Sequence, residues 1–383
     1  MIKKIALPLL LLTLLGFKHP DNSLNDCDIS KTLGNAAPVI DGPGQNDGPY
    51  VLYKNDNIYA KYIVQSNGIR VVQTDSMAVS GKKNLSLRVN TDDSTKTFLV
   101  QLKDKLQNEK AEFKKVSRQF VISDIEGNFG AIRKLLQGNG VIDANYNWTF
   151  GNGHLVLIGD FVDRGAQVTE VLWLIYSLEE KAKAAGGYVH FILGNHEIMN
   201  MSNDLRYLHP KYVEGAILLN EHFMELFGEN SELGRWLRTK NIMEKIGDVL
   251  YTHAGISSQM NLLNTSISDI NKLARPFYAD TTYNYPNVKL EIIYSDFGPF
   301  WYRGYYQGKE KASTGQIDST LSWFGAEKIV TGHTIVAETI SAWYNGKVIN
   351  TDVHHAQGKS EALLIEGNKC YRVNMEGKKE LLL

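Results

Sequence analysis

The pattern of apolar and polar residues changes near Phe120. From there, short runs of continuously apolar residues alternate with longer segments of helical period. Apolar runs of this length are typical of strands that are buried on both faces. They predict strands at 119–123, 154–160 and 188–195, with helices at 131–136 and 168–185 between them. Strands that alternate with helices indicate an α/β fold whose sheet is covered by helices.

The part of the chain before Phe120 has a different pattern. Between Tyr50 and Val100, short apolar stretches alternate with turn residues, as in YVLYKNDNIYAKYIV and SNGIRVVQT. This pattern predicts short antiparallel strands and therefore a small β-rich region. The charged segment 101–115 is expected to be a helix or a solvated connector. The Gly-, Asn-, Asp- and Pro-rich segment that ends near residue 48 is expected to be a linker.

The second half of the chain continues the mixed pattern. Residues 204–239 are expected to be mainly helical, because VEGAILLNEHFMELFG has an amphipathic period. Further strands are predicted at VLYTHAG, KIVTGH, GKVINTDV, ALLIEG and KCYRVN, the last ones as hairpins. The chain is thus divided into a signal peptide (1–20), a linker (21–48), a small β-rich N-terminal region (49–115) and a main domain (116–383).

The first twenty residues predict export. A basic start, MIKK, precedes the apolar run IALPLLLLTLLGF, which has signal-peptide length and is short for a membrane span. A buried N-terminal element is the less favoured alternative, because polar sequence follows at once. We expect a periplasmic or extracellular protein with no transmembrane span in its mature form. The stretch LNDC leaves a lipid anchor at Cys27 open, although Asp26 fits a lipoprotein signal poorly.

Composition and charge narrow the class of partner. Hydrophobic residues make up 43% and charged residues 22% of the chain, which is ordinary for a globular protein with a sizeable core. The formal net charge is -1 and no long Lys/Arg run is present, so nothing predicts a nucleic-acid partner. Cys27 and Cys370 are the two cysteines. In an exported protein they can pair, and two unpaired thiols are the alternative.

Chemically versatile residues gather where the predicted strands end, at the positions where open α/β sheets bind ligands. They are Asp124 and Glu126; Asp160, Asp163 and Arg164; Asn195 and His196; His253; and His333. Each one alone has an ordinary structural explanation, such as a turn residue, a helix cap or a core histidine. Five strand ends that each supply Asp, Asn or His instead predict one shared site.

This set of residue types predicts a centre with two divalent metal ions. Carboxylate, amide and imidazole ligands suit Mn, Fe or Zn, with Mn as the first choice. A carboxylate that bridges two ions holds them roughly 3.5–4 Å apart, which suits in-line displacement at phosphorus. An ion activates a water molecule, an arginine grips the phosphate oxygens, and a histidine held by a carboxylate protonates the leaving alkoxide.

The stretches GDFVDRG, GNHE, THAG and TGH resemble the motifs of the calcineurin-like metallophosphoesterases, in particular the phosphoprotein phosphatase superfamily. The resemblance runs from about Val116 to about Asp352. Within the superfamily, LGNHEIMNM, DLRYLHPKY, GPFWYRGYY and VTGHT are most similar to the Shewanella-like phosphatases. The resemblance implies that 116–383 is a metallophosphoesterase domain, a β-sandwich of mixed sheets flanked by helices.

The resemblance also implies roles for single residues. The implied metal ligands are Asp124 and Glu126 for the first ion, Asp160 as the bridge, and Asn195, His253 and His333 for the second ion. His196 and Asp163 match a dyad in which the histidine is the general acid. Arg164 matches a phosphate-binding arginine, and Arg303 is expected either to be a second one or to stack on Trp301 or Tyr302. In NTDVHH, Asp352 and His354 are expected at the rim of the site, and neither is assigned as a ligand.

Glu126 stands where members of this family have a histidine. It lies two residues from Asp124, so in an extended segment both side chains would point the same way and reach the same ion. A carboxylate in place of an imidazole favours Mn, Mg or ferrous iron over Zn. The alternative is that Glu126 turns away and the first ion is weakly held or absent.

Together these observations predict a dinuclear metal-dependent phosphatase that hydrolyses phosphomonoesters by metal-activated hydroxide attack. By analogy with the family, the expected substrates are proteins that carry phosphotyrosine or phosphoserine/threonine, or small phosphomonoesters. A diadenosine polyphosphate or nucleotide hydrolase on the same fold is one alternative. A pseudo-enzyme that binds phosphorylated ligands without turnover is another, and only Glu126 favours it.

Overall fold

The computed structural model describes residues 46–308 and 311–383, and these belong to one compact unit. The predicted signal peptide, most of the predicted linker and Cys27 lie outside the described residues, so export and a lipid anchor stay predictions. Cys370 is buried. None of the helices in the described ranges combines the length and the apolar character that a membrane crossing requires.

The N-terminal region consists of antiparallel strands, as predicted. One sheet has three strands, β1 (Asp47–Lys54), β2 (Asn57–Ser66) and β3 (Ile69–Ala78), and a separate hairpin is formed by β4 (Ser86–Asn90) and β5 (Thr97–Gln101). The region is fastened to the helices that follow it, because the indole of Trp173 donates to the Pro49 carbonyl oxygen at 2.8 Å. The hydroxyl of Tyr53 also donates to Glu232.

The main domain is built on two six-stranded mixed sheets. The strands of the first sheet, in spatial order, are β17 (Lys379–Leu381), β16 (Lys369–Asn374), β15 (Glu361–Glu366), β7 (Arg118–Ile122), β8 (His154–Ile158) and β9 (Tyr188–Ile192). Those of the second are β13 (Ser341–Trp343), β14 (Val348–Asn350), β12 (Lys328–Thr331), β11 (Val249–Thr252), β10 (Met243–Ile246) and β6 (Glu112–Phe113). In the first sheet β7, β8 and β9 are parallel to one another.

The two sheets pack face to face. Val121, Val156 and Ile192 of the first sheet share one apolar cluster with Val249 and Val330 of the second. A hydrogen bond of 2.7 Å from the Tyr251 hydroxyl to the side chain of Gln119 also joins the sheets. The layers therefore form the mixed-sheet sandwich that the resemblance implies.

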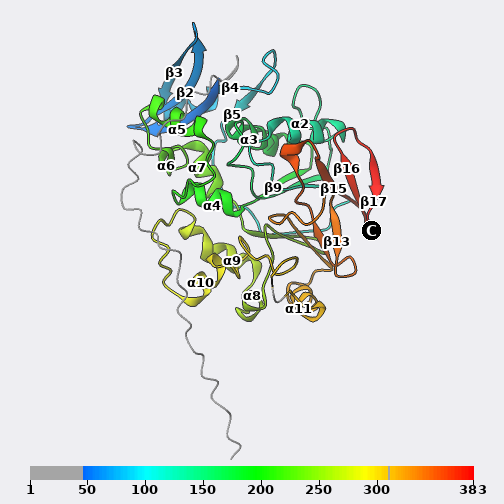
Figure 1. Ribbon diagram of the computed structural model, residues 1–383. Coiled ribbons are helices and arrows are strands. Elements are labelled where there is room, and N and C mark those ends of the chain that lie inside the picture. The colour runs from blue at the N-terminus through cyan, green and yellow to red at the C-terminus, as the bar shows by residue number, and fades with distance from the viewer. Residues whose placement is uncertain (1–45, 309–310) are drawn as a thin grey trace, which may run out of the picture. The chain divides into compact units, whose positions relative to one another are not determined.

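Helices cover the outer faces (Figure 1). On the side of the first sheet lie α2 (Phe129–Gly138) and α3 (Val168–Ala184), and α3 contacts both β9 and the N-terminal strands β1, β4 and β5. Short helices follow β9: α4 (Asn195–Met201), α5 (Pro210–Leu219), α6 (Phe223–Leu226) and α7 (Glu232–Leu237). The other side carries α8 (Ser258–Leu262), α9 (Ile267–Ala274), α10 (Val288–Tyr294) and α11 (Thr314–Phe324). Within 46–308 and 311–383 there are also three short 3-10 helices: η1 (Val79–Asn84), η2 (Arg275–Phe277) and η3 (His355–Gln357).

The expectation of a helix in the charged segment before the main domain is wrong. Segment 101–115 contains no helix, and its residues 112–113 form β6, which pairs with β10 at the edge of the second sheet. The segment is not fully solvated either, because Lys103 is buried and its ammonium group lies 2.6 Å from the carboxylate of Glu179. The predicted boundary at 115/116 stays a prediction.

Candidate active site

Loops that follow β7, β8, β9, β11 and β12 meet at a cavity of about 360 Å³. Most of the predicted site residues line it: Asp124, Glu126, Asp160, Arg164, Asn195, His196, Arg303 and His333. The remaining two, Asp163 and His253, are fully buried behind the lining. The structure thus brings together residues that are up to 209 positions apart in sequence, such as Asp124 and His333.

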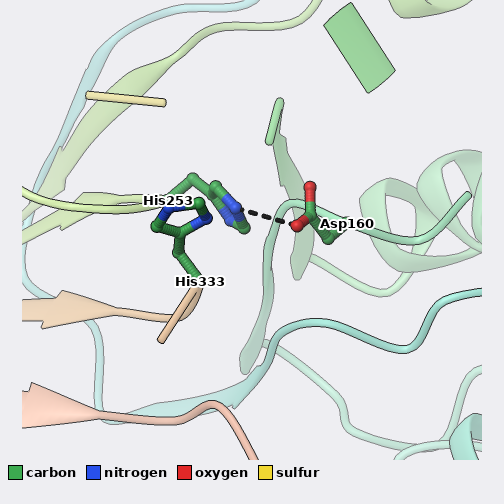
Figure 2. Close-up of side chains that lie close together, drawn as sticks. All are labelled: Asp160, His253 and His333. Carbon is green, nitrogen blue, oxygen red and sulfur yellow. Dashed lines mark ion pairs between the residues drawn. The ribbon is translucent and has the colours of Figure 1, made fainter. Parts of the chain in front are cut away.

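The centre of the site is a buried group formed by Asp160, His253 and His333 (Figure 2). Each of the three offers an oxygen or nitrogen atom within 4.8 Å of the others. His253 Nε2 lies 3.0 Å from Asp160 Oδ2. The same nitrogen is 3.0 Å from Asn195 Oδ1, so a carboxylate and an amide oxygen converge on one imidazole.

The hydrogen bonds of His253 indicate what this group binds. Its Nδ1 lies 2.8 Å from the Ile158 carbonyl oxygen, an acceptor, so Nδ1 carries a proton. In a neutral ring Nε2 then presents a lone pair to two oxygens, an arrangement that only a proton or a cation between them makes favourable. His333 Nε2 is buried and has no hydrogen-bond partner among the described residues. This donor set fits a metal ion bound by Asp160, Asn195, His253 and His333.

Two glycines leave room for these ligand atoms. A Cβ atom on Gly194 would lie 2.2 Å from Asp160 Oδ1, and one on Gly332 would lie 2.2 Å from Asp124 Oδ2. Both distances are far below van der Waals contact. The Gly in GNHE and the Gly in TGH are therefore required by the close approach of two carboxylates to the backbone.

Three carboxylates share the other side of the site. Burial raises the pKa of Asp124 to about 6, and the Asp160 charge adds to this effect. Burial, with Asp124 as the next cause, raises the pKa of Asp352 well above its usual value. Burial would also raise the pKa of Asp160, but His253 outweighs it and holds that pKa low. The raised pKa values of Asp124 and Asp352 show that burial disfavours their charged forms, which a bound cation would stabilise.

The pKa values of the two histidines at the centre, His253 and His333, are shifted in opposite directions. Burial disfavours the charged ring of His253, but the Asp160 carboxylate outweighs it and raises the pKa of His253 to about 10. Burial, together with the charge on His253, lowers the pKa of His333 well below its usual value. His333 is therefore held neutral, which is the form that binds a metal ion, and at His253 a bound cation would take the place of the proton that lies between the ring and Asp160.

Six of the site residues have backbone conformations in the left-handed region, which non-glycine residues rarely adopt. They are Asp124 (φ 52°), Glu126 (49°), Asp160 (59°), Asp163 (67°), Arg164 (55°) and His333 (66°). The expectation that Asp124 and Glu126 continue an extended strand is wrong, because β7 ends at Ile122. The backbone after β7 hydrogen-bonds to the loop after β8, because the Glu126 N–H group donates to the Asp160 carbonyl oxygen at 2.9 Å.

The side chain of Glu126 forms an ion pair with Arg164. The backbone brings the two together, because Gly165 N–H donates to the Glu126 carbonyl oxygen at 2.9 Å. The Arg164 guanidinium also lies 5.1 Å from the centre of the Tyr207 ring. In this arrangement the carboxylate of Glu126 is directed to an arginine. Its assignment as a ligand of the first ion stays a prediction.

His196 and Asp163 form the expected dyad. His196 Nδ1 lies 2.7 Å from Asp163 Oδ2, and the other oxygen of Asp163 accepts from Asn200 Nδ2 at 2.8 Å. His196 Nε2 lies 3.8 Å from Asp160 Oδ2, beside the group that fits the metal ion. Burial opposes protonation of His196, but Asp160 and Asp163 outweigh it and raise its pKa.

Arg303 and His354 lie at the rim of the cavity. Arg303 Nη1 donates to the His333 carbonyl oxygen at 3.0 Å and to the Thr334 hydroxyl at 3.2 Å, so this arginine also supports the loop that carries His333. Asp352 and His354 both line the cavity, but Asp352, which was expected at the rim, is buried.

Three residues that contribute to the site were not assigned roles from the sequence. The carboxylate of Glu197 accepts from the backbone N–H groups of Asp160, Phe161 and Gly194, and it ties the loops after β8 and β9 together. Asn200 orients Asp163. Tyr207, from DLRYLHPKY, has its ring centre 5.1 Å from that of His196. All three lie within the sequence motifs that carry the family resemblance, and this resemblance was the signal by which they could have been assigned to the site.

Comparison with known proteins agrees with this geometry. Residues 118–337, more than half of the chain, match the family described as calcineurin-like phosphoesterase. The solved structure of a cold-active protein-tyrosine phosphatase from a psychrophilic Shewanella species is 34% identical with a TM-score of 0.80, and the match covers 89% of this chain and 100% of that chain.

Two curated relatives are similar over shorter stretches. Shewanella-like protein phosphatase 1 of Plasmodium berghei is 29% identical over 226 residues, which is 56% of this chain and 60% of that protein. Shewanella-like protein phosphatase 2 of Arabidopsis thaliana is 36% identical over 110 residues, 28% of each chain. The chain therefore spans less than two thirds of both. It belongs to the calcineurin-like phosphoesterase family and is a phosphoesterase similar to the Shewanella-like protein phosphatases.

Proposed function

We propose that this phosphoesterase holds two divalent metal ions and hydrolyses phosphomonoesters, with phosphotyrosine or phosphoserine/threonine side chains of exported proteins as its substrates. The observation that carries the proposal is the buried group of Asp160, His253 and His333, with Asn195 beside it and the His196–Asp163 dyad at its edge. Family members use divalent ions, and this donor set fits one.

The first ion would be held on the carboxylate side of the site. Asp160 would bridge the two positions, and Asp124 lies beside it, as the charge coupling between them indicates. When bound, such ions supply a water molecule of lowered pKa and neutralise phosphate oxygens. Manganese is the preferred choice, because oxygen ligands predominate on this side.

The chain's own residues orient the substrate and move the proton. Arg164 lines the cavity with half of its side chain exposed, so its guanidinium is available to bind phosphate oxygens in a bidentate manner. Asp163 fixes one nitrogen of His196 and leaves the other toward the cavity, where it can protonate the leaving oxygen. Asn200 in turn fixes Asp163. Each member of this chain of contacts is buried, which keeps the imidazole in one orientation toward the cavity.

The rim favours an aromatic leaving group. Tyr207 is 42% exposed and lies against both Arg164 and His196, and Trp301 lines the same cavity. A phosphotyrosine ring can pack on such aromatic side chains, whereas a phosphoserine side chain offers no ring. The structural relative named as a protein-tyrosine phosphatase supports the same substrate class.

The test is turnover of p-nitrophenyl phosphate by protein stripped of metal and then supplied with Mn, Fe or Zn, followed by a panel of phosphopeptides and diadenosine tetraphosphate. We expect metal-dependent turnover and faster hydrolysis of phosphotyrosine peptides than of phosphoserine peptides. Faster hydrolysis of the dinucleotide would support the nucleotide hydrolase instead. Binding of phosphopeptides without turnover at any metal would support the pseudo-enzyme.

A further inference from the structure

The ion pair between Glu126 and Arg164 occupies the arginine that the proposed function assigns to phosphate. The pair is a consequence of the backbone, since the residue after Arg164 hydrogen-bonds to Glu126 itself. This hydrogen bond holds the two backbone segments side by side, so the side chains of Glu126 and Arg164 lie close together without any further interaction. A neutral histidine at position 126 could not form this pair, so the glutamate gives the arginine a charged partner.

The location of Glu126 differs from that of the group that fits the metal ion. Its side chain is 19% exposed, whereas those of Asp160 and His253 are 4% and 0% exposed. The group of ligand atoms that lie within 4.8 Å of one another contains Asp160, His253 and His333, which are the bridge and the ligands assigned to the second ion, and neither Asp124 nor Glu126 is part of it. The carboxylate side is instead supplied by Asp124, Asp160 and Asp352, which are all buried and line the same cavity.

We propose that Glu126 is a positioning residue for Arg164 and an internal competitor of phosphate, and not a ligand of the first metal ion. The guanidinium is held at the edge of the cavity by an anion that belongs to the chain. A phosphate group must then share the guanidinium with Glu126 or displace it. In either case Glu126 offsets part of the positive charge that the guanidinium offers to phosphate, so the site binds free phosphate weakly and releases the product readily.

This inference rests on the proposed function, because it assumes that Arg164 binds the phosphate group. The expected size of the effect on phosphate affinity follows from the solvent exposure of the Arg164 side chain. Arg164 is half exposed, so solvent screens its pair with Glu126, and removal of one charge from such a pair changes an affinity by about two- to tenfold. The effect is large enough to measure by titration and too small to abolish function.

The experiment uses the full chain loaded with manganese, with inorganic phosphate as the probe. The variants are Glu126→Gln, which keeps the shape and removes the charge, Arg164→Ala, and the double variant. Manganese per chain is measured by elemental analysis, and phosphate affinity is measured by calorimetric titration. Glu366→Gln is the matched control. Glu366 lies on strand β15 and, like Glu126, it forms an ion pair, in this case with Lys379.

We expect Glu126→Gln to keep the wild-type manganese content and to bind phosphate about two- to tenfold more tightly. The gain should disappear in the Arg164→Ala background, because the glutamate acts through that arginine. Glu366→Gln should change neither quantity.

Loss of one manganese ion from Glu126→Gln would show that Glu126 is a ligand and overturn the proposal. An unchanged or weaker phosphate affinity would overturn it too, as would an equal gain with and without Arg164. A wild-type protein that binds neither manganese nor phosphate would refute the proposed function and this inference together. If only the Glu126 variants deviate from expectation, the proposed function stands and the inference alone fails.

Discussion

Replacement of His196 by alanine tests the dyad most directly. His196 is buried, its Nδ1 is held 2.7 Å from Asp163, and its Nε2 lies at the cavity, 3.8 Å from Asp160 Oδ2. One nitrogen is thus committed to orientation and the other is free to deliver a proton. A lost general acid lowers kcat by about 10²–10⁴, which corresponds to about 3–5 kcal/mol of transition-state stabilisation.

The assay compares kcat for substrates whose leaving groups differ in basicity. A nitrophenolate departs without a proton, whereas the alkoxide of phosphoserine needs one. The full loss is therefore expected for phosphoserine peptides and a much smaller loss for p-nitrophenyl phosphate. Metal content should stay at the wild-type level, because no metal-ligand role is assigned to His196.

A structural side effect must be separated from the catalytic one. Alanine at position 196 leaves the fully buried carboxylate of Asp163 with Asn200 as its remaining side-chain donor, which costs about 1–3 kcal/mol of stability. Asn200→Ala is the matched control. It removes the 2.8 Å hydrogen bond to the same carboxylate, and Asn200 does not line the cavity. We expect a comparable drop in melting temperature and less than about a tenfold loss of kcat. Equal losses for aryl and alkyl substrates in His196→Ala would refute the general-acid role.

Three further predictions follow from the site and the core. His253→Ala and Asn195→Ala should each lower the bound metal, measured by elemental analysis, and remove most of the activity while circular dichroism stays unchanged; wild-type metal content would refute their assignment as ligands. Gly194→Ala should also lower the bound metal, since its Cβ would lie 2.2 Å from Asp160 Oδ1; unchanged binding would mean that the loop can move aside. Burial raises the pKa of Glu170 from 4.5 to about 8. The folded chain then keeps a proton that the unfolded chain releases, so stability should fall as pH rises from about 4.5 to about 8. Glu170→Gln should flatten that fall in melting temperature, and an identical pH profile in the variant would contradict the shift.

The elements that sequence predicted best were those whose pattern is set locally. The runs predicted as strands at 119–123, 154–160 and 188–195 contain β7, β8 and β9, which end at Ile122, Ile158 and Ile192. They form strands because they are apolar on both faces, and the structure buries them between the second sheet and the helices. Segment 101–115 was misjudged because its conformation depends on distant partners. Its charges suggested solvent, but Lys103 and Glu109 pair with residues on α3 and near α7.

The same distinction applies to the site. Motifs located the ligand-type residues, because each follows a strand and all the strands concerned end at the same edge. The direction of the Glu126 side chain could not be predicted, since it depends on a left-handed backbone and on the bond between Gly165 and Glu126. The motif NTDVHH predicted Asp352 only at the rim of the site, and its burial beside Asp124 could not be predicted because the two residues belong to distant parts of the chain.

The left-handed backbone of six site residues has a consequence for protein engineering. An L-residue with a side chain in this conformation is less stable than glycine by about 1 kcal/mol, with Asp the least penalised. Asp124, Glu126, Asp160, Asp163, Arg164 and His333 all have this conformation. Glycine at Arg164, whose side chain is half exposed, is therefore expected to relieve conformational strain and raise thermal stability, whereas glycine at the buried aspartates would also remove hydrogen bonds that hold the loops together. A screen for heat resistance alone would select the Arg164 substitution, so it would enrich robust proteins that lack the arginine proposed to bind phosphate.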